Sequence, residues 1–464
     1  MSATLVVFTS ADCSAFAAQP ASTAISSPRD ATTVTMPRDV TLLPMTPIYL
    51  RLGNYPSVTA LVSEHTAVLE TTGERAAPRF ETVDSEGAFA RLGDQWNNLV
   101  YASARPSPFM LHCWLLEWWR HYGEGCRLAV ETAYRGGRLV GALPLVTFSR
   151  RGLRVATFIG ARQSCLGDVL LAEGEGTELV DALVDRTSAS EHDYADLFGL
   201  AADSRLATLQ GPRSVRLFER VAAPVLDLNR GWSATYRVKT DSRKRSHHKR
   251  RRRQLAELGK VEVTHARTID ELAPALEEGF RVHELRWRGR PDGSGLVTET
   301  GMRFSRAALR GLAELDAARI VSLVLDGRTI AFSWYFVLGD RAYLHRLAFD
   351  PAFARCSPGL INALDTLESV AGQGVRRVEF LGGAERYKVE LADRFEPLHL
   401  GLGLPGSAAG RAVVRSRATW LGLRERGKSS GLARKLYYGS AGARNRLTRR
   451  RDVLRPTGVR RAGD

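Results

Sequence analysis

The chain has 464 residues and a mass of 51.1 kDa, with 44% hydrophobic and 25% charged residues. These values are typical of globular proteins and exclude a collagen-like or fully disordered chain, and the length predicts two or three domains. The mean hydropathy of −0.19 and the lack of a run of about 18 apolar residues argue against a helical membrane protein. The formal charge of +16 and the pI near 10.0 are typical of proteins that bind nucleic acids or membranes.

The positive charge is concentrated in two segments of the chain. Residues 237–253 hold 10 Lys+Arg and one acid, a net of +9, and residues 411–464 hold 16 Lys+Arg and 3 acids, a net of +13. The rest of the chain is left with a net charge of −6. A nucleic-acid surface that extends over the whole protein is therefore disfavoured.

Residues 1–78 are rich in Ser, Thr, Ala and Pro and show weak periodicity, so we expect a largely disordered leader. The first basic residue is Arg29, which disfavours a secretory signal peptide, and Met36 and Met45 are alternative starts. The five cysteines are widely spaced and form no CxxC pair, which disfavours a disulfide framework or a zinc site. We therefore expect no metal and a reducing cytosolic location. The cysteines are Cys13, Cys113, Cys126, Cys165 and Cys356.

The first α/β unit is expected over residues 79–228. Apolar residues at helical spacing predict helices over 85–101 and 109–122, and the aromatic stripe of the second is typical of a core. Strands are predicted on both sides of the turn at Gly136-Gly137. The predicted strands are 127–134, 138–148, 154–159, 168–171 and 194–200, with a helix at 177–188.

The second α/β unit is expected over residues 259–406, after a basic linker helix at 229–258. That helix either captures phosphate from RNA, lipid or a cofactor, or is a solvated linker. Predicted helices are 269–288, 302–317 and 359–372, and predicted strands are 319–325, 329–338, 341–349 and 375–381. GGRLVGALPL (136–145) and DGRTIAFSWYF (326–336) each follow two helices and a strand, which indicates two copies of one unit.

A candidate anion site lies where the predicted strand 341–349 leads into the helix that starts near Gly359. Ser357 can cap that helix, and Pro358 suits its first position. Gly359 removes a side chain where a ligand would approach, and Arg355 adds a positive charge. A helix N-terminus favours phosphate, although Ser-Pro-Gly is also a common helix start.

A second candidate site follows the predicted strand 375–381, at the break Gly382-Gly383. Strand ends in α/β sheets are frequent ligand sites. Glu379 or Glu385 is a candidate general base, Tyr387 a candidate general acid and Lys388 a candidate clamp for an anion. The alternative is a surface turn with ordinary charges.

Together these segments resemble the acyltransferases of the GNAT superfamily that include the CelD/BcsL cellulose-biosynthesis proteins, which are related to the FemABX peptidyltransferases. The resemblance covers residues 80–405. The matching runs are PFMLHCWLLEWWRHYG, LVGALPLV, GLVTETGMRFSRAALRGL, DGRTIAFSWYF and YLHRLAFDPAFARCSPGLINALDTLESVAGQGVRRVEFLGGAERYK.

The resemblance implies an α/β fold of two tandem GNAT-like domains with mixed central sheets. It also implies acetyl-CoA or another acyl-CoA as co-substrate, with its pyrophosphate over the helix start formed by Ser357, Pro358 and Gly359. The sequence departs from the common GNAT phosphate loop (Q/R-x-x-G-x-G/A), because only Arg355 and Gly359 can be placed on it.

The same resemblance implies that a carboxylate or a water molecule is the general base and that Tyr387 donates a proton to the thiolate. His345 is the rival of Glu379 and Glu385 as the base. Further candidate substrate residues are Asp168, Arg286 and Trp287. The expected reaction is acyl transfer to a polysaccharide, amino-sugar or related cell-envelope precursor.

Two other functions stay open. The basic linker is compatible with a FemABX-like transfer from aminoacyl-tRNA. The two basic segments are compatible with a non-catalytic module that binds membrane or nucleic acid. Residues 407–464 form a basic amphipathic tail, with stretches at 413–423 and 432–447 that favour an anionic membrane surface. We expect a cytoplasmic protein that works at the inner face of that membrane.

Overall fold

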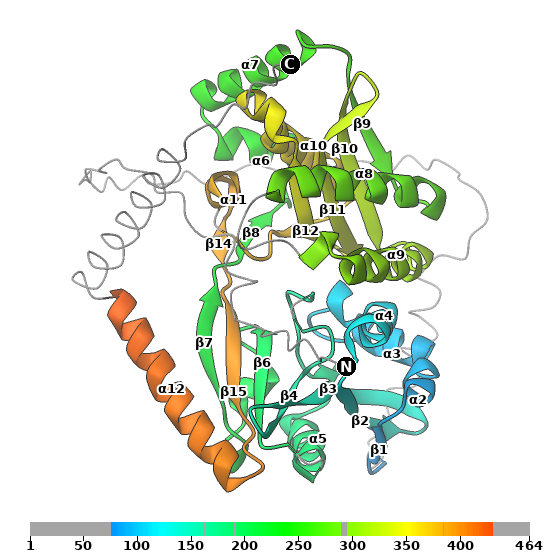
Figure 1. Cartoon of the computed structure of the whole chain (residues 1–464), viewed down its shortest axis with the longest axis vertical. Coiled ribbons are helices and arrows are strands. Elements are labelled where there is room, and N and C mark those ends of the chain that lie inside the picture. Colours follow the sequence, from blue (N-terminus) through cyan, green and yellow to red (C-terminus); the bar gives the residue numbers. More distant parts are fainter. Residues whose placement is uncertain (1–75, 162, 190–191, 289–294, 384, 430–464) are drawn as a thin grey trace, which may run out of the picture. The chain divides into compact units, whose positions relative to one another are not determined.

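The computed structural model describes residues 76–161, 163–189, 192–288, 295–383 and 385–429 (Figure 1). Most of the expected leader, Cys13 and the second tail stretch at 432–447 lie outside the described residues. None of the helices within the described ranges is long and apolar enough to span a membrane.

The first sheet contains strands from the first half of the chain and one strand from its end. Its order is β1-β2-β3-β4-β6-β15-β7, and β5 pairs with β3. The pair β4–β6 is parallel and the other pairs are antiparallel. The strands are β1 (Arg79–Val83), β2 (Cys126–Arg135), β3 (Arg138–Arg150), β4 (Leu153–Phe158), β5 (Leu170–Leu171), β6 (Tyr194–Leu200), β7 (Val215–Val221) and β15 (Leu398–Gly403).

The second sheet has the order β14-β8-β13-β12-β11-β10-β9, and β12–β13 is its parallel pair. Its strands are β8 (Pro224–Asp227), β9 (Val261–Ala266), β10 (Ala318–Leu325), β11 (Arg328–Leu338), β12 (Arg341–Phe349), β13 (Arg377–Glu379) and β14 (Arg394–Phe395).

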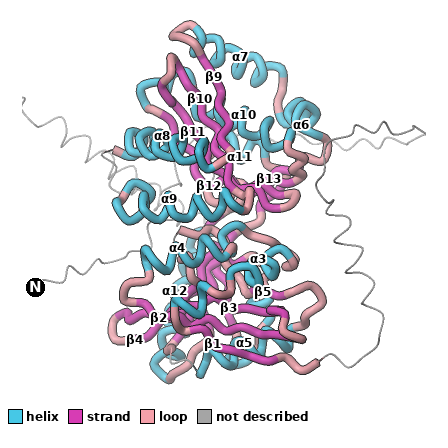
Figure 2. The backbone as a smooth tube through the Cα atoms, turned by 90° about the vertical axis from the view of Figure 1, so that its right-hand side faces the viewer, coloured by secondary structure: helices cyan, strands magenta, loops and turns pink. Residues whose placement is uncertain are grey.

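The helices connect and cover these sheets (Figure 2). Those of the first half are α2 (Glu86–Ala90), α3 (Gly93–Tyr101), α4 (His112–Tyr122) and α5 (Thr177–Ala189). Those that follow are α6 (Gly231–Lys239), α7 (Ser242–Ala256), α8 (Ile269–Trp287), α9 (Glu299–Glu314), α10 (Pro358–Gly372), α11 (Arg386–Leu391) and α12 (Ala408–Ser429). Short 3₁₀ turns include η1 (Pro108–Met110) and η5 (Pro351–Cys356).

The two sheets share one plan. Each has a single parallel pair joined through a crossover helix, α5 between β4 and β6 and α10 between β12 and β13, as a parallel connection requires. The prediction of an α/β fold with two mixed sheets is confirmed. The strand assignment differs from the expected division at 228 and 406, because β8 lies in the second sheet and β15 in the first. Such an exchange depends on pairing between distant segments, which local sequence patterns do not encode.

Several expected elements differ in their bounds. The helix predicted over 85–101 is two helices, α2 and α3, with Arg91 and Leu92 between them. The one predicted over 302–317 begins earlier, because the Thr298 side chain accepts a hydrogen bond from the Gly301 N–H at 3.0 Å and so caps α9. The linker helix predicted over 229–258 is two helices, α6 and α7. Strands β1, β7, β8, β9, β14 and β15 and helix α11 have no counterpart among the predicted elements.

The aromatic stripe of the predicted helix 109–122 is core, as expected. The ring of Trp114 on α4 lies 4.8 Å from that of Phe304 on α9, and the Phe109 ring lies 5.6 Å from that of Phe336 on β11. A single hydrophobic cluster therefore includes residues of both halves. At this contact a Cβ on Gly311 of α9 would lie 2.4 Å from the Cys113 Cβ, so the glycine permits close packing of α4 on α9.

Candidate active site

Strands β12 and β13 pair over only a short length. Arg341–Tyr343 face Arg377–Glu379, and the two strands separate beyond Tyr343 and Glu379. β12 continues for six more residues, to Phe349, with β11 on its other side. We call the place where β12 runs on without a register partner in β13 the opening between these strands. Strand ends of this kind are places where α/β proteins bind ligands.

A β-bulge lies on β12 next to this opening. Trp334 of β11 faces Arg346 and Tyr335 faces Leu344, so His345 is an extra residue without a partner in the register. The His345 ring lies 5.1–5.4 Å from the rings of Phe109, Trp114, Trp334 and Phe336. The bulge thus turns His345 toward the aromatic core shared with α4.

His345 is a weak base in this environment. Burial, followed by the positive charge of Arg346 and by His283 of α8, holds the pKa of His345 well below its usual range. Its Nδ1 atom is buried without a hydrogen-bond partner in the parts of the chain described. A neutral imidazole among aromatic rings fits the expected general base poorly.

The start of α10 differs from its expected form. Ser357 has left-handed backbone angles (φ 55°, ψ 49°), and its carbonyl, not its hydroxyl, accepts hydrogen bonds from Leu360 N at 3.1 Å and Ile361 N at 3.2 Å. The expected side-chain cap is therefore wrong, whereas Pro358 occupies the first helical position as predicted. In this conformation the hydroxyl does not cover the first turn of the helix.

Gly359 makes room for a side chain of its own protein. A Cβ at this position would lie 2.7 Å from Phe349 Cδ1, so the glycine lets the last ring of β12 pack against the first turn of α10. Gly359 therefore has a packing role, and the interpretation that it also makes space for a ligand stays a prediction. Pro358 has no N–H and the N–H groups of Leu360 and Ile361 donate to Ser357, so the backbone donor that this helix start offers is the N–H of Gly359.

The basic helix α7 is packed against this helix start. Arg251 donates a hydrogen bond to the carbonyl of Arg355, and Arg252 forms an ion pair with Asp365 of α10. At the other end of α7, Lys244 Nζ lies 3.4 Å from Glu390 Oε2 of α11. The basic segment is therefore a packed part of the second half, with further exposed basic side chains at Arg243, Lys249, Arg250 and Arg253.

Glu379 belongs to an ion-pair network. Its Oε1 lies 2.6 Å from Arg377 Nη2 and 3.9 Å from Arg341 Nη1, and Arg377 also pairs with Glu396 at 2.7 Å. The two guanidinium groups hold this carboxylate in place within the network. This geometry favours a structural role over the expected general base.

Lys388 holds the turn after β13. Its Nζ donates to the carbonyls of Phe380 at 3.3 Å and Gly382 at 2.9 Å, and lies 3.1 Å from Glu385 Oε2. The ammonium group is buried, and these contacts use its donors within the turn. Lys388, the expected ligand for a substrate anion, thus stabilises the segment that carries Glu385.

Tyr387 lies on α11, with its ring centre 6.2 Å from that of Phe380. Burial, with the nearby charge of Glu385, raises the pKa of the Tyr387 phenol well above its usual range. The phenol therefore keeps its proton at neutral pH, but the raised pKa also makes it a weaker acid, so the expected role of Tyr387 as proton donor stays a prediction.

Of the other candidates, Arg286 reaches the end of β12, Trp287 lies beside His283 on α8, and Asp168 lies in the first half. Arg286 Cζ lies 4.8 Å from the Phe349 ring centre, and the Trp287 ring stacks on His283 at 5.9 Å. Asp168 is held in the first half, where it accepts hydrogen bonds from Ser204 Oγ at 2.7 Å and from Val169 N at 2.8 Å. Burial raises the pKa of Asp168 to about 6.

Sequence reasoning missed Arg346 and His283. The positive charge of Arg346 acts on His283 of α8 and on Tyr122 of α4, so this arginine lies where the two halves meet. Burial, followed by the charges of Arg346 and Arg286, lowers the pKa of His283 to about 3. No residue pattern indicates these positions, because they depend on the bulge and on packing between halves.

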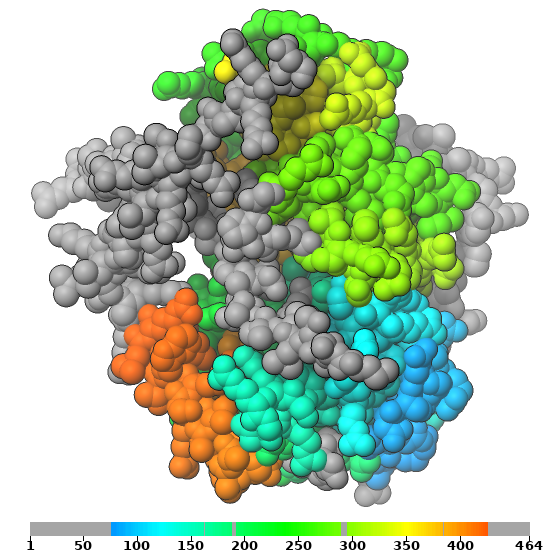
Figure 3. All heavy atoms as spheres, viewed as in Figure 1, coloured from blue at the N-terminus to red at the C-terminus, as the bar shows by residue number. Residues whose placement is uncertain are grey.

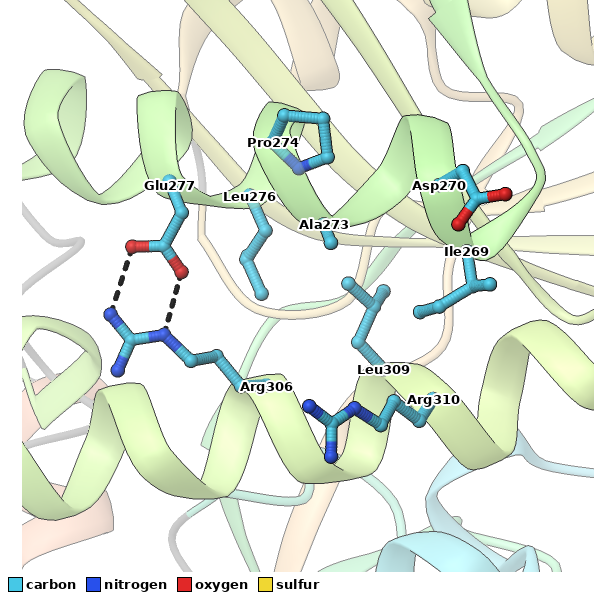
Figure 4. A pocket seen from close by; sticks show the side chains of 9 residues that line it. All are labelled: Ile269, Asp270, Ala273, Pro274, Leu276, Glu277, Arg306, Leu309 and Arg310. Carbon is cyan, nitrogen blue, oxygen red and sulfur yellow. Dashed lines mark hydrogen bonds and ion pairs between the residues drawn. The ribbon is translucent and has the colours of Figure 1, made fainter.

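Two surface grooves lie elsewhere. One has a volume of about 500 Å³ between α8 and α9, and the bidentate pair of Glu277 with Arg306, at 2.6 and 2.8 Å, crosses it (Figure 4). The other, of about 480 Å³, lies at His265 of β9 and at Asp365 of α10. Neither contains a candidate catalytic residue, and no cluster of three metal-ligating side chains occurs within the described ranges.

Residues 242–389, which include β12, α10, β13 and part of α11, match the family model described as an acetyltransferase (GNAT) domain. This segment is therefore similar to a GNAT acetyltransferase domain. No curated protein matched the sequence.

Among solved structures, three distant similarities each cover nearly all of the other chain. A conserved protein of unknown function from Bacteroides thetaiotaomicron is 15% identical over 69% of this chain and 99% of its own, with a TM-score of 0.47. FemX is 11% identical over 69% and 96%, with a TM-score of 0.48. L-PGS from Bacillus licheniformis is 13% identical over 75% and 98%, with a TM-score of 0.43.

Proposed function

We propose that this protein transfers an acyl group from acetyl-CoA or another acyl-CoA to an amine or hydroxyl of a polysaccharide, amino-sugar or related cell-envelope precursor. We further propose that it belongs to the CelD/BcsL type. The observation that carries the proposal is the opening between β12 and β13 beside the start of α10, within the segment that matches the GNAT domain.

The residues around the α10 start suit a donor with several phosphates. The backbone N–H groups of a first helical turn favour an anion, and the Arg355 side chain is exposed next to it. The exposed arginines of α7 add positive charge, because α7 is packed against η5 and α10. Arg355 and Arg250 would hold the phosphates, and the acyl end would enter between β12 and β13.

When bound, an acyl-CoA supplies an activated thioester. The chain's own contribution is to orient that group and to manage protons. Tyr387 holds a proton at its phenolic oxygen and is the donor for the leaving thiolate. Glu385, which has Lys388 as its partner, ranks above the doubly paired Glu379 and the weakly basic His345 as acceptor of the proton from the nucleophile.

A thiol-release assay tests this assignment. Full-length protein is mixed with acetyl-CoA and a panel of amino sugars, and free CoA is measured over time. Release that depends on both acceptor and enzyme supports the proposal. Equal rates with and without protein for every acceptor and acyl chain would contradict acyl-CoA transfer.

Aminoacyl-tRNA is the competing donor, because α7 also offers exposed arginines to a nucleic-acid backbone. The two donors are separated by activity that requires charged tRNA and is abolished by ribonuclease. Activity with acyl-CoA in ribonuclease-treated protein excludes the tRNA-dependent reaction.

We also propose that α12 brings the enzyme to an anionic membrane at its cytoplasmic face. α12 lies at the surface (Figure 3), and Trp420 and Leu423 are 58% and 60% exposed. Arg424 Cζ lies 5.5 Å from the Trp420 ring centre, which puts a cation beside exposed apolar groups. Co-sedimentation with phosphatidylglycerol vesicles, lost in Trp420→Ser and absent with phosphatidylcholine vesicles, is expected. Equal sedimentation of wild type and Trp420→Ser would contradict this role.

A further inference from the structure

Arg346 has neither a hydrogen bond nor an ion pair with any described residue, although its Nε atom is buried. Arg377 on the same sheet differs, because it pairs with both Glu379 and Glu396. Arg341 is intermediate, since its Nη1 is buried without a hydrogen bond to any described residue but lies 3.9 Å from Glu379 Oε1. A buried donor of a charged group is costly when it has no acceptor. The position is therefore one where an acceptor from outside the chain would be stabilising.

Two further polar atoms beside Arg346 are also buried without a hydrogen-bond partner in the described part of the chain. Trp334 Nε1 and His345 Nδ1 are buried without hydrogen-bond partners among the residues that the structure describes. Trp334 faces Arg346 across the β11–β12 register, and its ring centre lies 5.1 Å from that of His345. Three adjacent buried polar groups without partners are rare in folded proteins and call for an explanation.

The electrostatics around this cluster are positive. Arg346 and Arg286 both act on His283, and Arg346 acts on His345, while the two histidines are held neutral by burial. Tyr122 of α4 also feels the charge of Arg346. An anion would thus meet a guanidinium group with little competing negative charge. The Arg346 side chain is only partly buried, so that anion can reach it.

We propose that Arg346 binds an anionic oxygen of the acceptor substrate, a carboxylate or a phosphate, with Trp334 Nε1 as a second donor. This assignment rests on the proposed acyltransferase function and names a chemical class for its acceptor. The planar guanidinium group suits the two oxygens of either anion. The acceptor class is therefore an amino sugar or amine that carries a phosphate or carboxylate.

The position of Arg346 suits an acceptor and not the donor. Ser333, one position from Trp334 on β11, donates to Asn362 of α10 at 2.6 Å, so Ser333 points to the α10 face. Trp334 points to the opposite face, where α4 and α8 lie. Arg346 lies opposite Trp334 in the β11–β12 register. The proposed donor site at the start of α10 and the proposed acceptor site at Arg346 thus lie on either side of β12, next to the opening.

An anion titration tests the site without a known acceptor. The melting temperature of the full chain is measured in sodium phosphate, sodium acetate and sodium chloride at equal ionic strength. For wild type we expect phosphate or acetate to raise the melting temperature more than chloride does. The anion with the larger effect, phosphate or acetate, identifies the type of anion that binds. Arg346→Gln should lose this increment, whereas Arg138→Gln, which removes an exposed arginine of β3, should keep it.

Kinetics give the second arm. With acetyl-CoA as donor, glucosamine 6-phosphate is compared with glucosamine, and alanine with alaninamide. Arg346→Gln should raise KM at least tenfold for the charged acceptor of the preferred pair and leave the neutral one unchanged. The dissociation constant of acetyl-CoA should not change in this variant.

Each result has a distinct meaning. An equal anion increment in wild type and Arg346→Gln overturns the assignment of Arg346. If Arg346→Gln does not fold, Arg346→Lys replaces it and must lower the anion affinity at least threefold, and an unchanged affinity overturns the proposal. A protein that shows the Arg346-dependent increment but binds no acyl-CoA disproves the proposed function and leaves the anion site intact.

Discussion

Arg286 and Phe349 meet where the two candidate regions of the second half adjoin, with Arg286 Cζ 4.8 Å from the centre of the Phe349 ring. The same ring packs against Gly359, the second residue of α10. Phe349 therefore joins the end of α8 to the helix start proposed to hold the donor phosphates. This contact predicts that packing at Gly359 affects stability as well as binding.

Replacing Gly359 with Ala should destabilise the fold by about 1–3 kcal/mol, because the added methyl group overlaps the Phe349 ring. Urea unfolding of the purified variant measures the change. Gly372→Ala, at the last residue of the same helix, is the control, because its Cβ would meet no described atom within 4 Å. Equal stability of the two variants would show that the ring has room to move.

Replacing Arg346 with Met should stabilise the protein by about 1 kcal/mol or more, because a partly buried guanidinium group without a partner is exchanged for an apolar side chain of similar length. Calorimetry should show a melting temperature a few degrees above that of wild type. Arg346→Lys, which keeps the charge, should show no increase. A melting temperature below wild type in the Met variant would indicate that Arg346 already has a stabilising partner.

Replacing Lys388 with Ala should cost about 3 kcal/mol of unfolding free energy, because two carbonyl groups and the Glu385 carboxylate lose a buried partner. Arg386→Ala, which removes the 88% exposed side chain of a surface pair, should change stability by less than about 0.5 kcal/mol. Chemical denaturation compares the two. A small effect at Lys388 would mean that the turn is held by other contacts.

Asp168 should make stability fall as the pH rises. Burial raises its pKa from 3.8 to about 6 in the folded state, so between these values the folded protein holds a proton that the unfolded chain has lost. The stability contribution of the neutral acid is thus complete below about pH 4 and is lost as the pH passes 6. Asp168→Asn should reduce this slope, which is worth about 3 kcal/mol in total. Asp203→Asn, at a 75% exposed carboxylate whose charge is the smallest of the causes named for the Asp168 pKa shift, should keep most of this slope in unfolding titrations from pH 4 to 7.5.

Replacing Tyr387 with Phe should lower kcat by a factor of about 10–100 and leave acyl-CoA affinity unchanged, because the phenol serves as a proton donor only in the transfer step. Steady-state thiol release and donor binding measure the two quantities separately. An unchanged kcat would remove Tyr387 from the reaction.

The segment from β11 to α10 was largely predictable from local patterns. The strand predicted over 341–349 has the observed bounds of β12, and the helix start at Pro358 follows from the ring that fixes its backbone. The repeat of hairpin and helix along the chain likewise predicted two copies of one α/β unit, and the family resemblance implied their mixed sheets. These features depend on residues close together in the sequence.

The fine structure of the site was not predictable in this way. The bulge at His345 is set by register with β11, and the packing of α7 depends on contacts of Arg251 and Arg252 with residues more than 100 positions away. Lys388 and Glu379 carry the charges typical of a catalytic site. In the fold, Lys388 stabilises a turn and Glu379 belongs to an ion-pair network. Charge type alone does not distinguish these roles.

Isothermal titration of acetyl-CoA and longer acyl-CoAs into the full-length protein tests the central claim most directly. We predict saturable binding that weakens several-fold in Arg355→Ala, an exposed residue beside the α10 start, and is unchanged in Arg138→Ala. The absence of binding by any acyl-CoA, or equal affinity in both variants, would contradict a donor site at the start of α10.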